Sequence, residues 1–175
     1  MKVCCVSAKA RSGKDEAASY LKEYLEANQK RVLIIHFADL LKFICTKLFD
    51  WNGEKDEAGR TLLQYVGTDV IGTKNPTYWV DWLTGVLKMF KDKWDYVIIP
   101  DCRYPIEYNI ITANFDSVLL RIERPYFNNG LTDKQKSQPS EVALDDYKYD
   151  YTICNNSTLD QLKTAVIAFA DTQLL

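Results

Sequence analysis

The chain has 175 residues, of which 47% are hydrophobic and 13% aromatic, so it can bury one sizeable core and we expect a single domain over residues 1–175. Its formal net charge of -2 lacks the surplus of Lys and Arg that neutralises a nucleic-acid backbone. The composition therefore argues against DNA or RNA as a partner. The composition does not exclude a small phosphorylated ligand, because such a ligand needs only a few local cations.

The cysteines and the hydropathy pattern indicate the compartment. The five cysteines are odd in number and scattered, and four lie in apolar runs, which predicts neither a disulfide framework nor a zinc site. No run approaches about 18 apolar residues without a charge, and the apolar start is too short for a signal peptide. We expect a protein of the reducing cytoplasm that does not bind a membrane.

Five short β-branched runs predict strands, and most are continuous rather than alternating. They cover residues 2–6, 31–37, 96–100, 117–122 and 150–154. Continuous apolar runs are typical of strands buried on both faces of a parallel sheet, and parallel strands require crossover connections between them. The pattern predicts an α/β fold.

Helical periodicity appears between these strands. The predicted helices cover residues 14–27, 39–49, 60–70 and 76–90, with a fifth after a near capping box at 157–160. Asn75 and Pro76 supply N-cap and first-turn signals for the fourth helix. The polar stretch at 128–139 has the composition of a mobile loop, and such long loops in compact domains are often lids.

SAKARSGKDE, residues 7–16, nearly matches the phosphate-binding pattern GxxxxGK[ST]. Gly13 and Lys14 fit, while Ala8 and Asp15 depart from the pattern. The stretch lies between a predicted strand and a predicted helix, where backbone N–H groups and the helix N-terminus can hold phosphate. The alternative is an ordinary charged turn before a helix. We predict an ATP-binding loop, formed by Ala10, Arg11, Ser12, Gly13, Lys14, Asp15 and Glu16.

Two acids are candidate Mg²⁺ ligands. Asp15 stands where a Ser or Thr hydroxyl usually binds the ion, and its carboxylate can hold the metal directly or through water, or can repel the nucleotide. Asp101 directly follows the predicted strand VIIP, where an acid can reach the metal shell. Ala8 is a weaker departure, since a left-handed conformation there costs roughly 1–2 kcal/mol.

These features resemble the phage-type deoxynucleoside monophosphate kinases, members of the P-loop kinases. AKARSGKD resembles the family's GKARSGKD, so the Asp after the Lys is itself familial, while Glu16 stands where the family usually has Thr. Further family-like strings span nearly the whole chain in the family's order. They are FADLLK (37–42), RTLLQYVGTD (60–69), PTYWVDWL (76–83), PDCRYPIE (100–107) and SEVALDDYKYDYTICNNSTLDQL (140–162).

The resemblance implies a three-layer P-loop kinase fold with a parallel five-stranded sheet in the order 2-3-1-4-5. It implies an acceptor-binding helical region at 38–94, a lid at 125–139 and Mg²⁺-dependent transfer of the γ-phosphoryl group of ATP to a deoxynucleoside monophosphate. A viral source would place the protein in the host cytoplasm. The alternatives are a P-loop kinase for another small acceptor, of the dephospho-coenzyme A or phosphomevalonate type, and a nucleotide-binding protein with impaired catalysis. A homodimer is compatible with the apolar helical faces.

Three arginines are candidates for contact with phosphate. Arg103 is expected to contact the transferring phosphoryl group, since it follows a strand's carboxyl end, where open α/β sheets bind ligands; the alternative is a surface pair with Glu107. Arg124 is the expected catalytic lid arginine. Arg121 is expected at the ATP site or, alternatively, as a solvated edge residue.

The acceptor site is expected on the helical region between the second and third strands. Its candidate residues are Lys42, Arg60, Gln64, Thr68, Asp69, Trp82, Arg103 and Glu141. Lys42 and Arg60 have the alternative of ordinary exposed helix charges. Trp79 shares a helical stripe with Leu83, so core packing is expected for Trp79, and Trp82 is the freer of the two.

Overall fold

The computed structural model describes residues 1–54 and 56–175; Lys55, within the expected acceptor-binding region, lies outside the described residues. All five strands pair in parallel in the order β2-β3-β1-β4-β5, which confirms the α/β fold class and the expected strand order. The strands are β1 (Lys2–Ala8), β2 (Val32–Ile34), β3 (Tyr96–Ile99), β4 (Asp116–Glu123) and β5 (Tyr151–Cys154).

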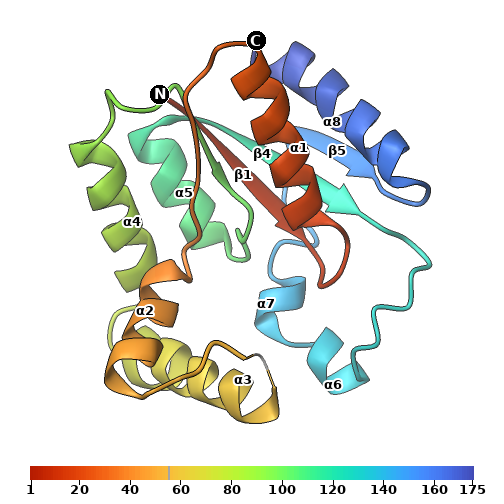
Figure 1. The fold of residues 1–175 in the computed structure, drawn as a ribbon. Helices are drawn as coiled ribbons and strands as arrows, with labels where there is room; N and C mark the ends of the chain where they lie inside the picture. The colour runs from red at the N-terminus through yellow and green to blue at the C-terminus, as the bar shows by residue number, and fades with distance from the viewer. Residues whose placement is uncertain (55) are drawn as a thin grey trace.

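Helices cover both faces of the sheet (Figure 1). On one face α1 (Lys14–Ala27) and α8 (Leu159–Gln173) bury Leu21, Val166 and Phe169 against the sheet. On the other face α4 (Tyr78–Met89) and α5 (Pro105–Asn114) bury Leu83, Leu87 and Ile111. The two apolar layers explain why the strands read as continuous hydrophobic runs, because both faces of each central strand are covered.

The remaining helices gather beyond the carboxyl ends of the strands (Figure 1). They are α2 (Asp39–Leu48), α3 (Glu57–Gln64), the π-helical η1 (Tyr65–Gly72), α6 (Asp133–Lys136) and α7 (Pro139–Val142). The first three lie between β2 and β3 and form a small core of their own around Cys45, Trp51 and Val66. A separate core lets this region act as a unit attached to the sheet.

Two predicted helices differ in the structure. The helix expected at 60–70 begins earlier, after Asp56 accepts a hydrogen bond from the N–H of Gly59, and widens into a π-helix from Tyr65. The helix expected from Pro76 begins only at Tyr78, because the Asn75 side chain accepts the N–H of Thr77 and closes a turn instead of capping the helix. Residues 128–139, expected as a loop, contain the short helix α6 and the start of α7.

Within the described residues, no helix combines the length and apolar character needed to cross a membrane. The cytoplasmic location and the homodimer stay predictions.

Candidate active site

The phosphate-binding loop joins β1 to α1 at the carboxyl edge of the sheet. Gly13 has a φ of 90° and directly precedes α1, and Arg11 has a φ of 62°. Ala8 lies in β1, so the left-handed backbone considered for Ala8 is found at Arg11 and Gly13 instead. A left-handed residue at a non-glycine position costs energy that the surrounding fold must supply, which is typical of functional turns.

Asn155, just after β5, supports this loop through a hydrogen bond. Its Nδ2 donates to the carbonyl of Ser12 over 3.0 Å, and its backbone N–H donates to Glu123 over 2.7 Å. A Cβ at Gly13 would lie 2.5 Å from the same Nδ2, so glycine is needed there for space as well as for φ. Sequence reasoning missed Asn155, because only its position after a strand hinted at a role.

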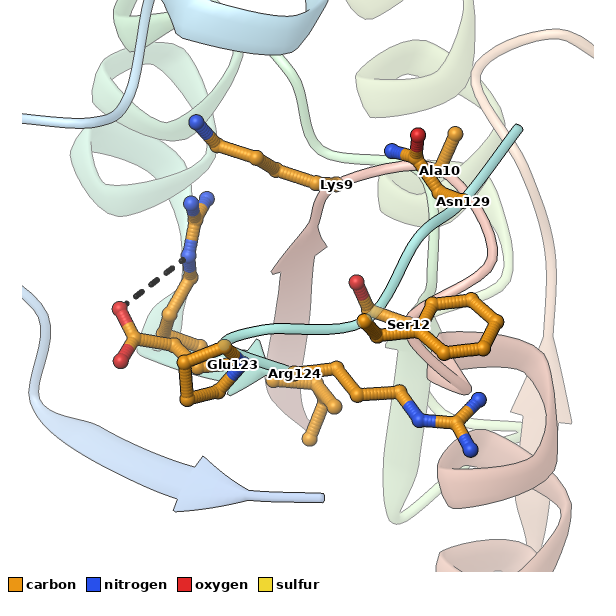
Figure 2. Close-up of a pocket in the computed structure, with 10 residues that line it drawn as sticks. Lys9, Ala10, Ser12, Glu123, Arg124 and Asn129 are labelled. Atoms are coloured by element: carbon orange, nitrogen blue, oxygen red, sulfur yellow. Dashed lines mark ion pairs between the residues drawn. The ribbon is translucent and has the colours of Figure 1, made fainter. Parts of the chain in front are cut away.

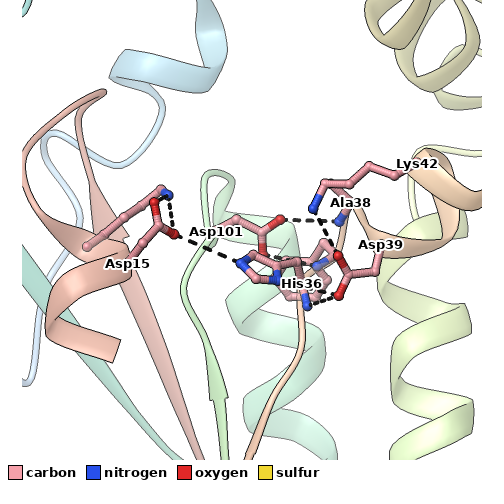
Figure 3. A network of polar contacts seen from close by, with 8 residues as sticks. Asp15, His36, Ala38, Asp39, Lys42 and Asp101 are labelled. Atoms are coloured by element: carbon pink, nitrogen blue, oxygen red, sulfur yellow. Dashed lines mark hydrogen bonds and ion pairs between the residues drawn. The ribbon is translucent and has the colours of Figure 1, made fainter. Parts of the chain in front are cut away.

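A network of charged side chains crosses from the loop to the acceptor-binding region (Figure 3). The Nζ of Lys14 lies 2.7 and 2.6 Å from the two oxygens of Asp15. His36 lies between two acids, with Nε2 3.9 Å from Asp15 and Nδ1 3.4 Å from Asp39, which also accepts from Lys42 over 2.9 Å. Contacts with His36, which has the largest effect, and with Lys14 hold the pKa of Asp15 well below its ordinary value. Asp15 in turn raises the pKa of His36.

The carboxylate of Asp101 holds the start of the expected acceptor-binding region. Its two oxygens accept the backbone N–H groups of Phe37, over 3.0 Å, and Ala38, over 3.2 Å. Among the described residues, no group of three or more His, Cys, Asp and Glu side chains is placed to hold a metal ion. Mg²⁺ commonly uses one or two carboxylates together with water and phosphate oxygens. The carboxylate of Asp15 fits that role, because it is 71% exposed beside the loop and its partners Lys14 and His36 are side chains, whereas Asp101 is bonded to the backbone N–H groups of two residues.

Arg103 reaches the phosphate loop through Glu141. One oxygen of Glu141 lies 3.1 Å from the Arg103 guanidinium and the other accepts the N–H of Ala10 over 2.9 Å. The alternative pairing with Glu107 involves the backbone instead, because Glu107 accepts the N–H groups of Arg103 and Tyr104 over 2.7 and 3.0 Å. The guanidinium is thereby left to pair with Glu141.

Two adjoining cavities open between the loop, the acceptor-binding region and α7. One, of about 450 Å³, is largely apolar and includes Trp79, Phe37 and Val80 in its lining. The other, of about 570 Å³, is more polar and includes Arg60, Gln64 and Glu141. The cavities share five lining residues, which are Leu63, Thr68, Arg103, Tyr104 and Pro139. Such a pair of cavities suits a ligand with one apolar and one charged end.

A third cavity, of about 280 Å³, lies between the phosphate loop and the start of the expected lid (Figure 2). The guanidinium of Arg124 stacks over Phe127, with its carbon 3.9 Å from the ring centre. Arg121 also lines this cavity but is buried, donating to Ser7 over 3.0 Å and to Asp145 over 3.1 Å. Burial excludes the alternative of a solvated edge residue for Arg121.

Comparisons with known proteins agree with this architecture. The sequence profile of the family described as "Deoxynucleotide monophosphate kinase" matches residues 29–166, well over half of the chain. The chain belongs to the deoxynucleotide monophosphate kinase family. This family membership confirms the resemblance and identifies the protein as a nucleotide kinase.

Solved structures show the same fold at low sequence identity. The Mycobacterium tuberculosis APS kinase CysC in complex with AMPPNP and APS is similar with a TM-score of 0.58 and 12% identity over 98% of both chains. Shikimate kinase from Aquifex aeolicus is similar with a TM-score of 0.52 and 14% identity over 98% of this chain and 96% of that one. A search of curated protein sequences found no match.

The family's expected acceptor residues divide into two groups in the structure. Arg60, Gln64, Thr68, Arg103 and Glu141 all line the polar cavity. Lys42 pairs with Asp39, and Asp69 is exposed on η1 outside the described cavities. The two tryptophans exchange their expected places: Trp79 lines the apolar cavity and donates to the carbonyl of Gly67, whereas Trp82 packs against the sheet core. Trp79 lies in the first turn of α4, where it borders the cavity, so its place at the end of the apolar stripe does not bury it in the sheet core.

Proposed function

We propose that this nucleotide kinase transfers the γ-phosphoryl group of ATP to a deoxynucleoside monophosphate, with Mg²⁺. The observation that carries the proposal is that Arg103 lines both adjoining cavities while pairing with a carboxylate bonded to the phosphate loop. An acceptor phosphate held by Arg103 would lie next to the loop that holds the donor. Phosphoryl transfer needs this positioning and charge neutralisation rather than a covalent nucleophile.

On the donor side, the proposal assigns the triphosphate to the loop amides between Ala10 and Glu16 and to the ammonium of Lys14. Gly13 is the last residue of the loop and directly precedes α1, so the positive end of that helix faces the bound anion. Mg²⁺ neutralises charge on the transferring group when bound, and Asp15 would hold it, directly or through water. Arg124, at the cavity beside the loop, is proposed to close over the donor with the lid at 125–139.

On the acceptor side, the proposal places the base in the apolar cavity and the monophosphate in the polar one. Trp79 and Phe37 offer aromatic surface for a base, and Arg60 and Arg103 offer charge for the phosphate. Gln135 of the lid lines the same polar cavity as Arg60 and Gln64. Closure of the lid would therefore cover the acceptor phosphate and exclude water from the reaction.

The test is turnover of the purified protein with Mg-ATP against the four deoxynucleoside monophosphates and their ribose counterparts, alongside dephospho-coenzyme A and phosphomevalonate. We expect diphosphate formation from at least one deoxynucleotide, and a loss of at least about a hundredfold in Lys14→Ala, because this ammonium faces the developing charge. Lys163→Ala, an exposed lysine on α8, is the matched control. Turnover of dephospho-coenzyme A or phosphomevalonate alone would overturn the proposed acceptor. Tight nucleotide binding without any turnover would favour a protein with impaired catalysis.

A further inference from the structure

The passage between the two acceptor cavities is where a nucleotide's sugar would lie, if the proposed function is right. A nucleoside monophosphate joins its base to its phosphate through the sugar alone. With the base beside Trp79 and the phosphate beside Arg60, the sugar must cross the residues common to both cavities. Tyr104 is the aromatic residue among those five.

The backbone of Tyr104 is held in place at two points. It follows Arg103 directly, so its position relative to the guanidinium that would hold the phosphate is fixed by the chain. Its backbone N–H donates to Glu107 over 3.0 Å at the start of α5. Its half-buried side chain lines both cavities, and Ser140 of α7 lines the polar one with it. A side chain restrained in this way forms a rigid wall rather than a mobile one.

A rigid aromatic wall discriminates between sugars. A 2′-hydroxyl pressed against the ring face would lose its hydrogen bonds to water without gaining a protein partner, whereas a 2′-deoxy carbon loses nothing. Thr68, which also borders the passage, has a hydroxyl that can accept or donate and so would tolerate a ribose.

We propose that the ring of Tyr104 sets a preference for 2′-deoxy over ribose acceptors, which makes it a specificity-determining residue of the proposed reaction. Rejection of an added hydroxyl by an apolar surface reaches about a hundredfold at most. We therefore expect the wild-type protein to prefer a deoxynucleotide over the matching ribonucleotide by about tenfold to a hundredfold in kcat/KM.

The experiment measures kcat/KM and calorimetric Kd for one deoxynucleoside monophosphate and its ribose counterpart, in the wild-type protein, Tyr104→Phe and Tyr104→Ala. Tyr104→Phe should keep the preference, because the ring and not the hydroxyl causes it. Tyr104→Ala should bring the ratio to within about threefold of one, mainly through better use of the ribonucleotide. If Tyr104→Ala does not fold, Tyr104→Ser supplies the same test, because its short polar side chain also removes the apolar wall.

The ratio of kcat/KM for the deoxynucleotide to kcat/KM for the ribonucleotide distinguishes this role from a structural one. A general loss of activity would lower kcat/KM for both substrates alike and leave the ratio unchanged. An unchanged ratio in Tyr104→Ala, with deoxynucleotide turnover intact, would overturn the role of Tyr104 and leave the proposed function standing. A wild-type protein without any sugar preference would also overturn it. Absence of both turnover and binding of any nucleoside monophosphate would overturn the proposed function, and this inference with it.

Discussion

The carboxylate of Glu141 lies 3.1 Å from the guanidinium of Arg103, and its other oxygen lies 2.9 Å from the N–H of Ala10. The Glu141 side chain is only 8% exposed, so both contacts are shielded from water. One acid from α7 thus joins the phosphate loop to the arginine at the end of β3. Shielded charge-assisted hydrogen bonds of this kind fix geometry more firmly than exposed ones.

Replacing Glu141 with Gln should release Arg103 from this position. The amide keeps the shape of the side chain but loses the charge that holds the guanidinium, and it presents an NH₂ group to one of the two donors. We expect kcat/KM for the acceptor to fall by about tenfold to a hundredfold, measured by steady-state kinetics. Glu26→Gln, an exposed acid on α1, is the control and should leave kcat/KM unchanged. Wild-type kinetics in Glu141→Gln would show that Arg103 does not depend on this acid.

Asp101→Asn should weaken the attachment of the acceptor-binding region to the sheet. Both oxygens of Asp101 accept backbone N–H groups, and an amide can accept only one of them while turning a donor towards the other. We expect the free energy of unfolding, measured with urea, to fall by about 1–3 kcal/mol. We also expect the KM for the acceptor to rise more than the KM for ATP, each compared with its wild-type value. A change confined to the Mg²⁺ requirement would instead indicate that Asp101 acts as a metal ligand.

Gly13→Ala and Gly85→Ala should have opposite effects on stability. At Gly13 the φ of 90° costs roughly 1–2 kcal/mol for alanine, and the new Cβ would meet the Nδ2 of Asn155 at 2.5 Å. Gly85 lies inside α4 with nothing within 4 Å of an added Cβ, so alanine there should stabilise the protein by about 0.5–1 kcal/mol. Thermal and urea unfolding of both variants test the pair. Equal stability of Gly13→Ala and wild type would contradict the geometry of the loop.

Glu107 should make the protein less stable as the pH rises. Burial raises the pKa of Glu107 to about 7, despite the opposing hydrogen bonds from the N–H groups of Arg103 and Tyr104. An unfolded glutamate titrates near about 4.3, so between about pH 4.3 and 7 the folded state holds a proton that the unfolded state has lost. The folded state is therefore favoured at the acid end of this window, and this contribution is lost as the pH rises through 7.

Glu107→Gln should flatten that decline. We expect the difference in urea midpoint between pH 5 and pH 8 to be smaller in the variant than in the wild-type protein. The single histidine also titrates in this range, with its pKa raised chiefly by Asp15, but it is common to both proteins and cancels in the comparison. An identical pH dependence in the two proteins would show that the pKa of Glu107 is not raised in the folded state.

Local pattern was sufficient for the position of each strand, although β2 ends at Ile34 rather than at residue 37, and for the helices whose periodicity is unbroken. The helix predicted at 14–27 matches α1, because its apolar spacing is regular and the loop before it ends in glycine. The region from 60 to 90 was predicted less well, because the π-helical turns of η1 replace the end of the predicted α-helix and the turn at Asn75 delays the start of α4. Trp79 and Trp82 exchanged their expected places because Trp79 lies in the first turn of α4, where the apolar cavity opens, while Trp82 packs against the sheet core.

By itself, the sequence determined the α/β class, the position of the phosphate loop and, through resemblance, the order of the strands. These follow from local periodicity and from a motif whose residues are adjacent in the chain. Only the tertiary structure decided that Asn155 supports the loop, that Glu141 joins it to Arg103 and that Asp101 anchors residues 37 and 38. These contacts join residues between 38 and 143 positions apart, and their partners are chosen by the packing of the sheet and its helices rather than by local spacing.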